Sequence, residues 1–256
     1  MKRSYTIMMI AALSCAALYV ACTSNSNNPT SNNNTGGASF TFKVGSSFVF
    51  DQWMLDTITG AKIPNSLKAV HEKVAAVLNS YQGMSNVYQV FDTTFTDSTA
   101  TTVASTDTLY YATSGSVVYQ YGFITQVFSI LLGPYVPMPP KWDIIANAGN
   151  ANWVVDTTAT TPFGLLPLQL VLDGKDAGNV NFSAAPNALQ SDNTSGSGSI
   201  VLTDSGKMYV IPISGNAYVS YSPAIVVKNY IASVLSTPNL GPVNGYERDL
   251  VSFSAN

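Results

Sequence analysis

Few residue types in this chain could carry out chemistry. The sequence has two cysteines, one histidine and fourteen carboxylates among its 256 residues. Cys15 and Cys22 both fall near the N-terminus, so the rest of the chain cannot form a disulfide, a thiolate nucleophile or a thiolate metal site. His71 alone cannot build a two-histidine zinc site, although it could serve a Ser-His-Asp arrangement. No nucleophile elbow and no nucleotide-binding glycine pattern accompanies it, so the sequence favours a protein that is not an enzyme.

The carboxylates are the remaining candidates for acid–base chemistry. Most are aspartates in turn-like sequence, such as Asp56-Thr57, where the short side chain bonds to its own backbone. The densest segment, 173–179 (DGKDAGN), lacks the alternating oxygen ligands and the closing Glu of a calcium loop, and it predicts a hairpin turn. We therefore expect no metal and no cofactor. A hydrolase that uses a close, buried pair of carboxylates in a cleft is the least favoured hypothesis.

The N-terminal segment is more informative. Lys2 and Arg3 precede an apolar run from Ile7 to Ala21, which ends at Cys22. This order is typical of a secretory signal, and a cysteine at the break resembles the signal of bacterial lipoproteins. Cys22 is preferred to Cys15 because polar, uncharged sequence follows it. The alternatives are an ordinary secretory signal or an uncleaved anchor, although the apolar run is shorter than the roughly 20 residues of a spanning helix.

The lipoprotein resemblance implies a diacylglyceryl group on the sulfur of Cys22 and a further acyl chain, such as palmitate, on the new amino terminus. Three acyl chains would hold the protein firmly on a membrane. Thr23 stands where an Asp would signal retention in the inner membrane, which indicates the outer membrane, on its periplasmic or its cell-surface side. We predict a signal peptide over residues 1–21, a lipidated flexible tether over 22–38 and a single β-rich domain over 39–256.

Composition limits the partners of this domain. The chain is 46% apolar and only 10% charged, which is ample for one large core. Removal of Lys2 and Arg3 with the signal would leave nine basic against fourteen acidic residues. The basic residues are scattered singly, so nucleic-acid binding is not expected.

Segments rich in Val, Tyr, Phe and Thr, bounded by Gly, Asp, Asn and Ser, predict strands. They are residues 49–55, 85–92, 107–121, 151–156, 199–203, 207–213 and 217–221. Short strands separated by polar turns favour a mainly antiparallel β fold. The Thr/Ser/Asp-rich segment 95–108 predicts a long hairpin loop, and Trp53 is expected in the core.

Residues 66–81 are ambiguous. Their apolar positions fit helical spacing, and Gly83 is placed as a helix terminator. The resemblance described below implies a strand instead, and we follow it.

Two apolar stretches, 123–142 and 161–172, stand out from the polar background. They either cross the core and close the fold, or line a site for an apolar ligand. The candidate ligand-lining residues are Phe123, Val127, Ile130, Leu131, Trp142 and Trp153.

The order of sequence landmarks resembles a known group of proteins. The landmarks are GSSFVFDQWMLDTITGAKIP, SYQGMSNVYQVFDTT, DTLYYATSGSVVYQYG, PPKW, NANWVVD, SYSPAIVVK and NGYERDLVSF. They resemble secreted lipoproteins of the Bacteroidetes/Chlorobi kind, whose folded part is similar to the LolA/LolB half-barrel superfamily. The resemblance covers most of residues 45–253. It implies an antiparallel sheet curled into a half-open β-barrel, with one or two short helices.

The same resemblance implies a concave apolar face that accepts a lipid or acyl ligand, gated by residues 123–140. Because a fold does not determine a function, this expectation rests on analogy. The alternative is a non-enzymatic envelope or surface interaction module, whose exposed Thr, Asn and Tyr side chains would contact a protein or a glycan.

Overall fold

The computed structural model describes residues 39–56, 59–126, 140–148, 152–160, 167–204, 207–233, 236–237, 241–242 and 245–255. All of them belong to one compact unit, Asn34–Asn256. The expected signal peptide, Cys22 and nearly all of the tether lie outside the described residues. Within the ranges given above, no helix is long and apolar enough to cross a membrane.

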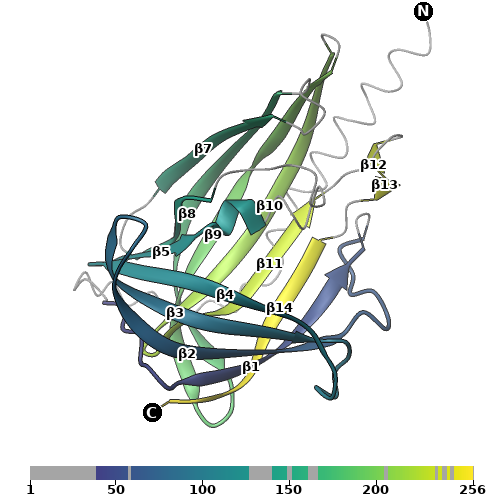
Figure 1. The fold of residues 1–256 in the computed structure, drawn as a ribbon. Coiled ribbons are helices and arrows are strands. Elements are labelled where there is room, and N and C mark those ends of the chain that lie inside the picture. The colour runs from purple at the N-terminus through teal and green to yellow at the C-terminus, as the bar shows by residue number, and fades with distance from the viewer. Residues whose placement is uncertain are drawn as a thin grey trace, which may run out of the picture. The chain divides into compact units, whose positions relative to one another are not determined.

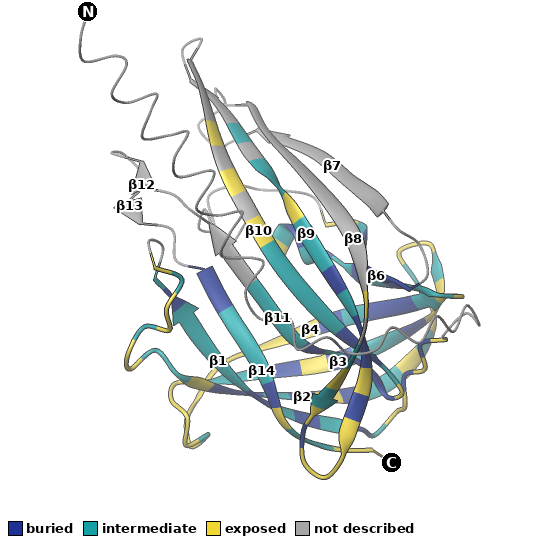
Figure 2. Cartoon of the chain, turned by 180° about the vertical axis from the view of Figure 1, so that it is seen from behind, coloured by how far each residue is buried: buried dark blue, intermediate teal, exposed yellow. Residues whose placement is uncertain are grey.

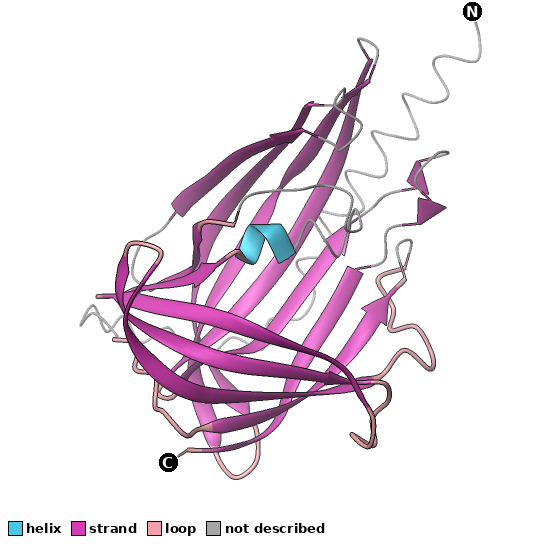
Figure 3. Ribbon diagram, viewed as in Figure 1, coloured by secondary structure: helices cyan, strands magenta, loops and turns pink. Residues whose placement is uncertain are grey.

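Strands dominate this unit (Figures 1 and 3). Their bounds are β1 Ser47–Leu55, β2 Lys68–Tyr81, β3 Met84–Phe95, β4 Val103–Ser114, β5 Val117–Tyr121, β6 Trp142–Asn147, β7 Asn152–Thr160, β8 Pro167–Ser183, β9 Ala188–Asp204, β10 Lys207–Tyr221, β11 Ala224–Ser233, β12 Ser236–Thr237, β13 Gly241–Pro242 and β14 Gly245–Ser254. In the described part of the chain, helix is limited to a single turn at residues 123–126.

Twelve strands form one antiparallel sheet in the order β6-β5-β4-β3-β2-β1-β14-β11-β10-β9-β8-β7. The order describes two meanders, β1–β6 and β7–β11, which are joined by β14 between β1 and β11. The sheet curls strongly, so that β2–β4 lie across the strands of the second meander and form a half-barrel (Figure 1). The expected fold class, an antiparallel curled sheet or half-open β-barrel, is confirmed.

The core occupies the inner face of the curled sheet. Alternate residues of a strand point to the same face, and Phe48 and Phe50 of β1 are buried together with Val70 and Val74 of β2. The buried apolar residues come from both meanders and from β14, whereas residues 103–108 of β4 are exposed (Figure 2). Burial of each such apolar side chain stabilises the fold by about 1.5–3 kcal/mol.

The segment before β1 closes one end of the half-barrel. Phe40 and Phe42 are buried in the core, and Thr41 between them exchanges backbone hydrogen bonds of 2.8 Å with Tyr221 and Ala224 at the β10–β11 turn. The ring of Phe42 stacks on Tyr88 with centroids 4.7 Å apart. This end of the interior is therefore filled by packed side chains.

Residues 68–81 form strand β2, as the family resemblance implied and the helical spacing did not. Gly83 lies in the β2–β3 turn, where Gln82 and Gly83 both have positive φ, at 47° and 82°. Such a pair of dihedrals is typical of the type I′ turn of a two-residue hairpin. Gly83 therefore ends a strand and not a helix.

Three local predictions were wrong. Residues 173–179 are not a hairpin turn but part of β8, which has a bulge between Asp176 and Asn179 opposite β9. The loop between β3 and β4 is shorter than expected, because β4 begins at Val103. Trp53 is only partly buried and is absent from the core, and the Lys62 ammonium lies 5.1 Å from its ring centroid.

Candidate functional site

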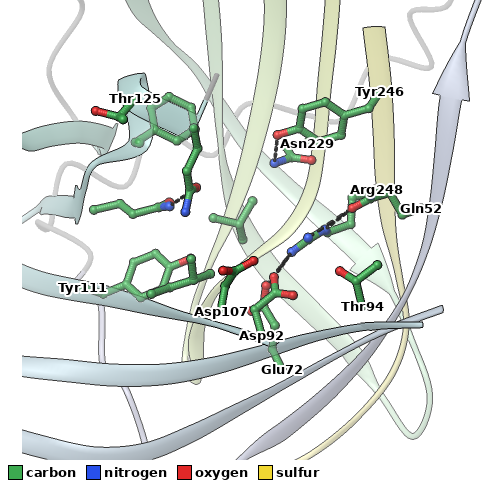
Figure 4. Close-up of a pocket in the computed structure, with 15 residues that line it drawn as sticks. Gln52, Glu72, Asp92, Thr94, Asp107, Tyr111, Thr125, Asn229, Tyr246 and Arg248 are labelled. Carbon is green, nitrogen blue, oxygen red and sulfur yellow. Dashed lines mark hydrogen bonds and ion pairs between the residues drawn. The ribbon is translucent and has the colours of Figure 1, made fainter. Parts of the chain in front are cut away.

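A cavity of about 310 Å³ lies on the inner face of the sheet (Figure 4), where its lining residue Tyr111 packs against Phe42 with ring centroids 5.4 Å apart. Its size falls at the lower end of the range for small-molecule sites. One wall is polar and charged, with side chains from β1, β2, β3, β4 and β14. These are Gln52, Glu72, Asp92, Thr94, Asp107 and Arg248.

Another part of the lining is apolar. Leu109 and Tyr111 of β4, Phe123 of the helical turn and Val226 of β11 contribute to it. Polar groups complete the lining, namely Gln120, Thr125, Gln126, Asn229 and Tyr246. The cavity thus combines apolar surface with a concentrated set of charges.

Strand pairing brings the charged residues together. Glu72 on β2 lies opposite Asp92 on β3, and Asp92 lies opposite Asp107 on β4. On the other side, Arg248 of β14 lies opposite Gln52 of β1. Each residue occupies an inward position of its strand, so three carboxylates and a guanidinium meet inside the half-barrel.

Arg248 is held by four hydrogen bonds. Its Nη1 donates to Glu72 Oε1 at 2.6 Å and to Asp92 Oδ2 at 2.9 Å. Its Nε and Nη2 donate to Gln52 Oε1 at 3.2 and 3.1 Å. The guanidinium carbon also lies 5.6 Å from the ring centroid of Phe50. The side chain is therefore fixed over the floor of the cavity.

Burial raises the pKa of Glu72 to about 8, since the opposing effect of Arg248 is smaller and neighbouring Asp92 raises the pKa further. Glu72 Oε2 is buried and has no hydrogen-bond donor. Protonation of Glu72 removes this defect, because a carboxylic acid can donate to Asp92 whereas two carboxylates only accept. Both effects favour the protonated form of Glu72 near neutral pH.

Tyr111 and Asn229 are further polar residues on the cavity wall. The Tyr111 side chain is 2% exposed. Burial, and then the charge of Glu72, raise the pKa of Tyr111 well above its usual value. Asn229 donates to the Tyr246 hydroxyl at 3.0 Å, while its own Oδ1 is buried and unpaired.

The helical turn at 123–126 is fixed against the cavity by two side chains. Asp143 of β6 accepts the backbone N–H of Ile124 at 2.9 Å, and Gln120 donates to Gln126 at 2.9 Å. Gly122, with φ of 76°, starts the turn. A methyl group at Gly122 would lie 3.2 Å from Pro140. These contacts place Phe123 on the cavity wall.

The predicted ligand-lining residues have different positions. Phe123 lines the cavity, whereas Val127, Ile130 and Leu131 lie outside the described residues. Trp153 is in β7 opposite Gly174, and its side chain is likewise outside the described part. The structure thus brings one of the six to the cavity.

Trp142 lies on the outer face of the sheet, in an aromatic cluster with Tyr81, Tyr110 and Tyr121. Tyr81 stacks on Tyr110 with ring centroids 3.9 Å apart. The Trp142 ring is 5.3 Å from Tyr121, and its Nε1 donates to the Gln82 carbonyl at 3.0 Å. Tyr110 and Tyr121 alternate with the inward Tyr111 and Gln120, so this outer aromatic cluster is separated from the cavity by the sheet.

Sequence reasoning missed the charged wall of the cavity. A signal was present in segments such as AVHEKV and QVFDTT, where an acidic residue shares the strand face of buried valines. His71, the neighbour of Glu72, lies on the other face and packs against Phe95 with ring centroids 4.7 Å apart. Among the described residues, no group of three or more His, Cys, Asp and Glu side chains could hold a metal ion.

Comparisons with known proteins show similarity in fold alone. No protein family matches the sequence, and no curated protein matches it significantly. The crystal structure of a "putative lipoprotein" from Parabacteroides distasonis has a TM-score of 0.53 and 10% identity, covering 84% of this chain and 97% of that one. A "putative exported protein with YmcC-like fold" from Bacteroides fragilis has a TM-score of 0.42 and 7% identity, covering 85% and 99%. Neither is described as a LolA or LolB protein, so that link stays a prediction.

Proposed function

We propose that this chain is a lipoprotein of the cell envelope, anchored in the outer membrane through Cys22, whose half-barrel binds an amphiphilic ligand without catalysis. The basic start, apolar run and cysteine of residues 1–22 support the anchor. The similarity in fold to the lipoprotein structure from Parabacteroides distasonis agrees with it. LolA/LolB-type binding of an acyl chain is the more specific form of this proposal.

The cavity is the observation that supports ligand binding. The interior next to the cavity is filled by Phe40, Phe42 and their neighbours, so a ligand would occupy the cavity and not the whole barrel. Leu109, Phe123 and Val226 would cover its apolar part, at about 25 cal/mol per Å² buried. Covering the charged wall around Arg248 with a bare hydrocarbon would be unfavourable, because the charged groups would lose water without gaining polar partners. An amphiphile with a short apolar part and a polar head fits both walls.

Native mass spectrometry of the lipid-anchored protein, purified gently from its own host, tests this function. We expect a discrete mass beyond the polypeptide and its anchor, which is lost on extraction with organic solvent. Replacement of Phe123 by Asp, which charges the apolar wall, should abolish the added mass, whereas Trp142→Phe on the outer face should retain it. An apo mass for the unaltered protein would refute a stably bound ligand.

A second candidate function, an envelope interaction module, is favoured by the outer aromatic cluster. Tyr81, Tyr110, Tyr121 and Trp142 are each only partly buried although they stack on one another. Aromatic residues are enriched at protein interfaces. Crosslinking in intact cells should then capture a partner that is lost in a Tyr81→Ala, Trp142→Ala double variant and retained in Phe123→Asp.

A further inference from the structure

We infer that the polar end of the cavity is a site for the cationic head of the ligand, an ammonium group held by Asp92, Asp107, Glu72 and the Tyr111 hydroxyl. This inference rests on the proposed ligand-binding function. It concerns the chemical class of the ligand, which that function leaves open.

The charge of the cavity wall is the first argument. Glu72, Asp92 and Asp107 face a single cation, Arg248, and the described lining contains no lysine and no other arginine. Arg248 has already committed both Nη1 protons to Glu72 and Asp92, and its Nε and Nη2 donate to Gln52. With Glu72 protonated, Asp92 and Asp107 still face only one guanidinium, so the wall keeps a net negative charge. This charge favours a positive ligand and repels the head of a fatty acid or a phospholipid phosphate.

The unpaired atoms are the second, independent argument. Asn229 Oδ1 is a buried acceptor without a donor, and so is Glu72 Oε2 when Glu72 is ionised. Both residues line the cavity (Figure 4). A buried polar atom without a partner is costly, so a ligand that donates hydrogen bonds would satisfy groups that the protein leaves open. An ammonium group has three donors and no acceptor.

Proton release would accompany binding of such a cation. Glu72 is faced by Arg248 and Tyr246 of β14, Asp92 of β3, Tyr111 of β4 and, farther along the wall, Asp107. Its pKa of about 8 means that most molecules are protonated at pH 7. A bound ammonium group stabilises the carboxylate form and lowers this pKa, so part of a proton leaves for each cation bound.

Three matched probes of equal chain length test the inference, namely hexylammonium, 1-hexanol and hexanoate. Each is titrated by calorimetry into the full lipid-anchored protein in nanodiscs, with empty nanodiscs as the blank. We expect hexylammonium to bind at least about tenfold more tightly than 1-hexanol, and hexanoate not to bind. The heat of hexylammonium binding at pH 7 should also differ between buffers of different ionisation enthalpy, with the sign that indicates release of protons to the buffer.

Two carboxylate variants separate the site from general surface charge. Asp107→Asn should weaken hexylammonium binding about threefold to fivefold, as expected for one exposed charge, and 0.5 M salt should weaken it as well. Asp51→Asn is the control, because Asp51 lies on the opposite face of β1 from Gln52 and Phe50. Equal effects of the two variants would overturn the inference.

The outcomes distinguish this inference from the proposed function. Equal or tighter binding of 1-hexanol or hexanoate would mean that the cavity binds ligands but does not select a cation. Failure of all three probes, together with an apo mass for the protein from its host, would refute the ligand-binding function itself.

Discussion

Glu72 and Asp92 lie directly opposite each other on β2 and β3, and both accept a hydrogen bond from the same nitrogen, Nη1 of Arg248. Like charges at opposite positions of a ladder destabilise a sheet. Here the guanidinium and a proton on Glu72 offset the repulsion. Because Arg248 comes from β14, the same contacts attach the last strand to the first meander from the inside.

Replacement of Arg248 by Met should destabilise the fold by about 3–5 kcal/mol, because it leaves two buried carboxyl groups without their cation. Equilibrium unfolding in urea, followed by tryptophan fluorescence, measures the loss. Lys228→Met is the matched control, since Lys228 pairs with Glu247 and Asp249 on the more exposed outer face, both at 2.7 Å. Its loss should be about 1 kcal/mol or less. Similar losses in both variants would show that Arg248 has no special role.

Glu72 should make the stability of the protein fall as the pH rises. The pKa of Glu72 is about 8 in the folded state, compared with 4.5 for an unperturbed Glu, as in the unfolded chain. Between these two pH values the folded state holds a proton that the unfolded state has lost. The contribution of Glu72 is fully present below pH 4.5 and is lost as the pH rises through 8, at a rate on the order of 1 kcal/mol per pH unit.

Urea midpoints measured between pH 5 and pH 9 check this dependence. In Glu72→Gln the urea midpoint should fall much less between pH 5 and pH 9, because the amide is neutral throughout. A variant that declines as steeply as the unaltered protein would assign the pH dependence to another group.

Gly83→Ala should destabilise the β2–β3 hairpin by about 1 kcal/mol. The φ of Gly83 is 82°, and an added Cβ would meet nothing within 4 Å, so the effect arises from the backbone alone. Gly83→Asn should cost less, since Asn tolerates positive φ better than Ala. Thermal unfolding of the unaltered protein and the two variants measures this order of stability. An Ala variant as stable as the Asn variant would contradict the prediction.

Cys22→Ser should release the protein from the membrane and abolish its labelling with palmitate. The apolar run before Cys22 can support export without lipidation, so the variant should be recovered as a soluble or uncleaved form. Fractionation after metabolic labelling makes the comparison, with Cys15→Ser as the control that should keep both properties. Loss of the label only in Cys15→Ser would show that the lipid is attached to Cys15 and not to Cys22.

The fold class was predictable from the sequence because most strands have β-type composition and are bounded by turn residues. The apolar residues of segment 66–81 have helical spacing although the segment forms a strand, and this has a physical reason. The β2–β3 register shifts between Val74 and Ala76, which interrupts the alternation of inward residues. Val77 is apolar yet 44% exposed. A bulge and an exposed valine together imitate the spacing of a helix.

The charged wall was not predictable, because it depends on pairing that is distant in sequence. Arg248 is 176 residues from Glu72 and 156 from Asp92. No local pattern shows that β14 inserts between β1 and β11, and hence that Arg248 lies beside these carboxylates. Trp142 illustrates the same limit, since its segment is apolar but its position in β6 turns it to the outer face.

The place of β14 in the sheet imposes an order on folding. The first meander can pair its own strands as the chain emerges, and so can the second, but neither is joined to the other until β14 is available. Ser47 of β1 pairs with Ser254 of β14, so the seam closes only after almost the whole described chain has been made. Contacts of such long sequence separation form slowly. Until then, β1 and β11 expose unpaired edges that could join other chains, which gives a chaperone a reason to hold the nascent protein.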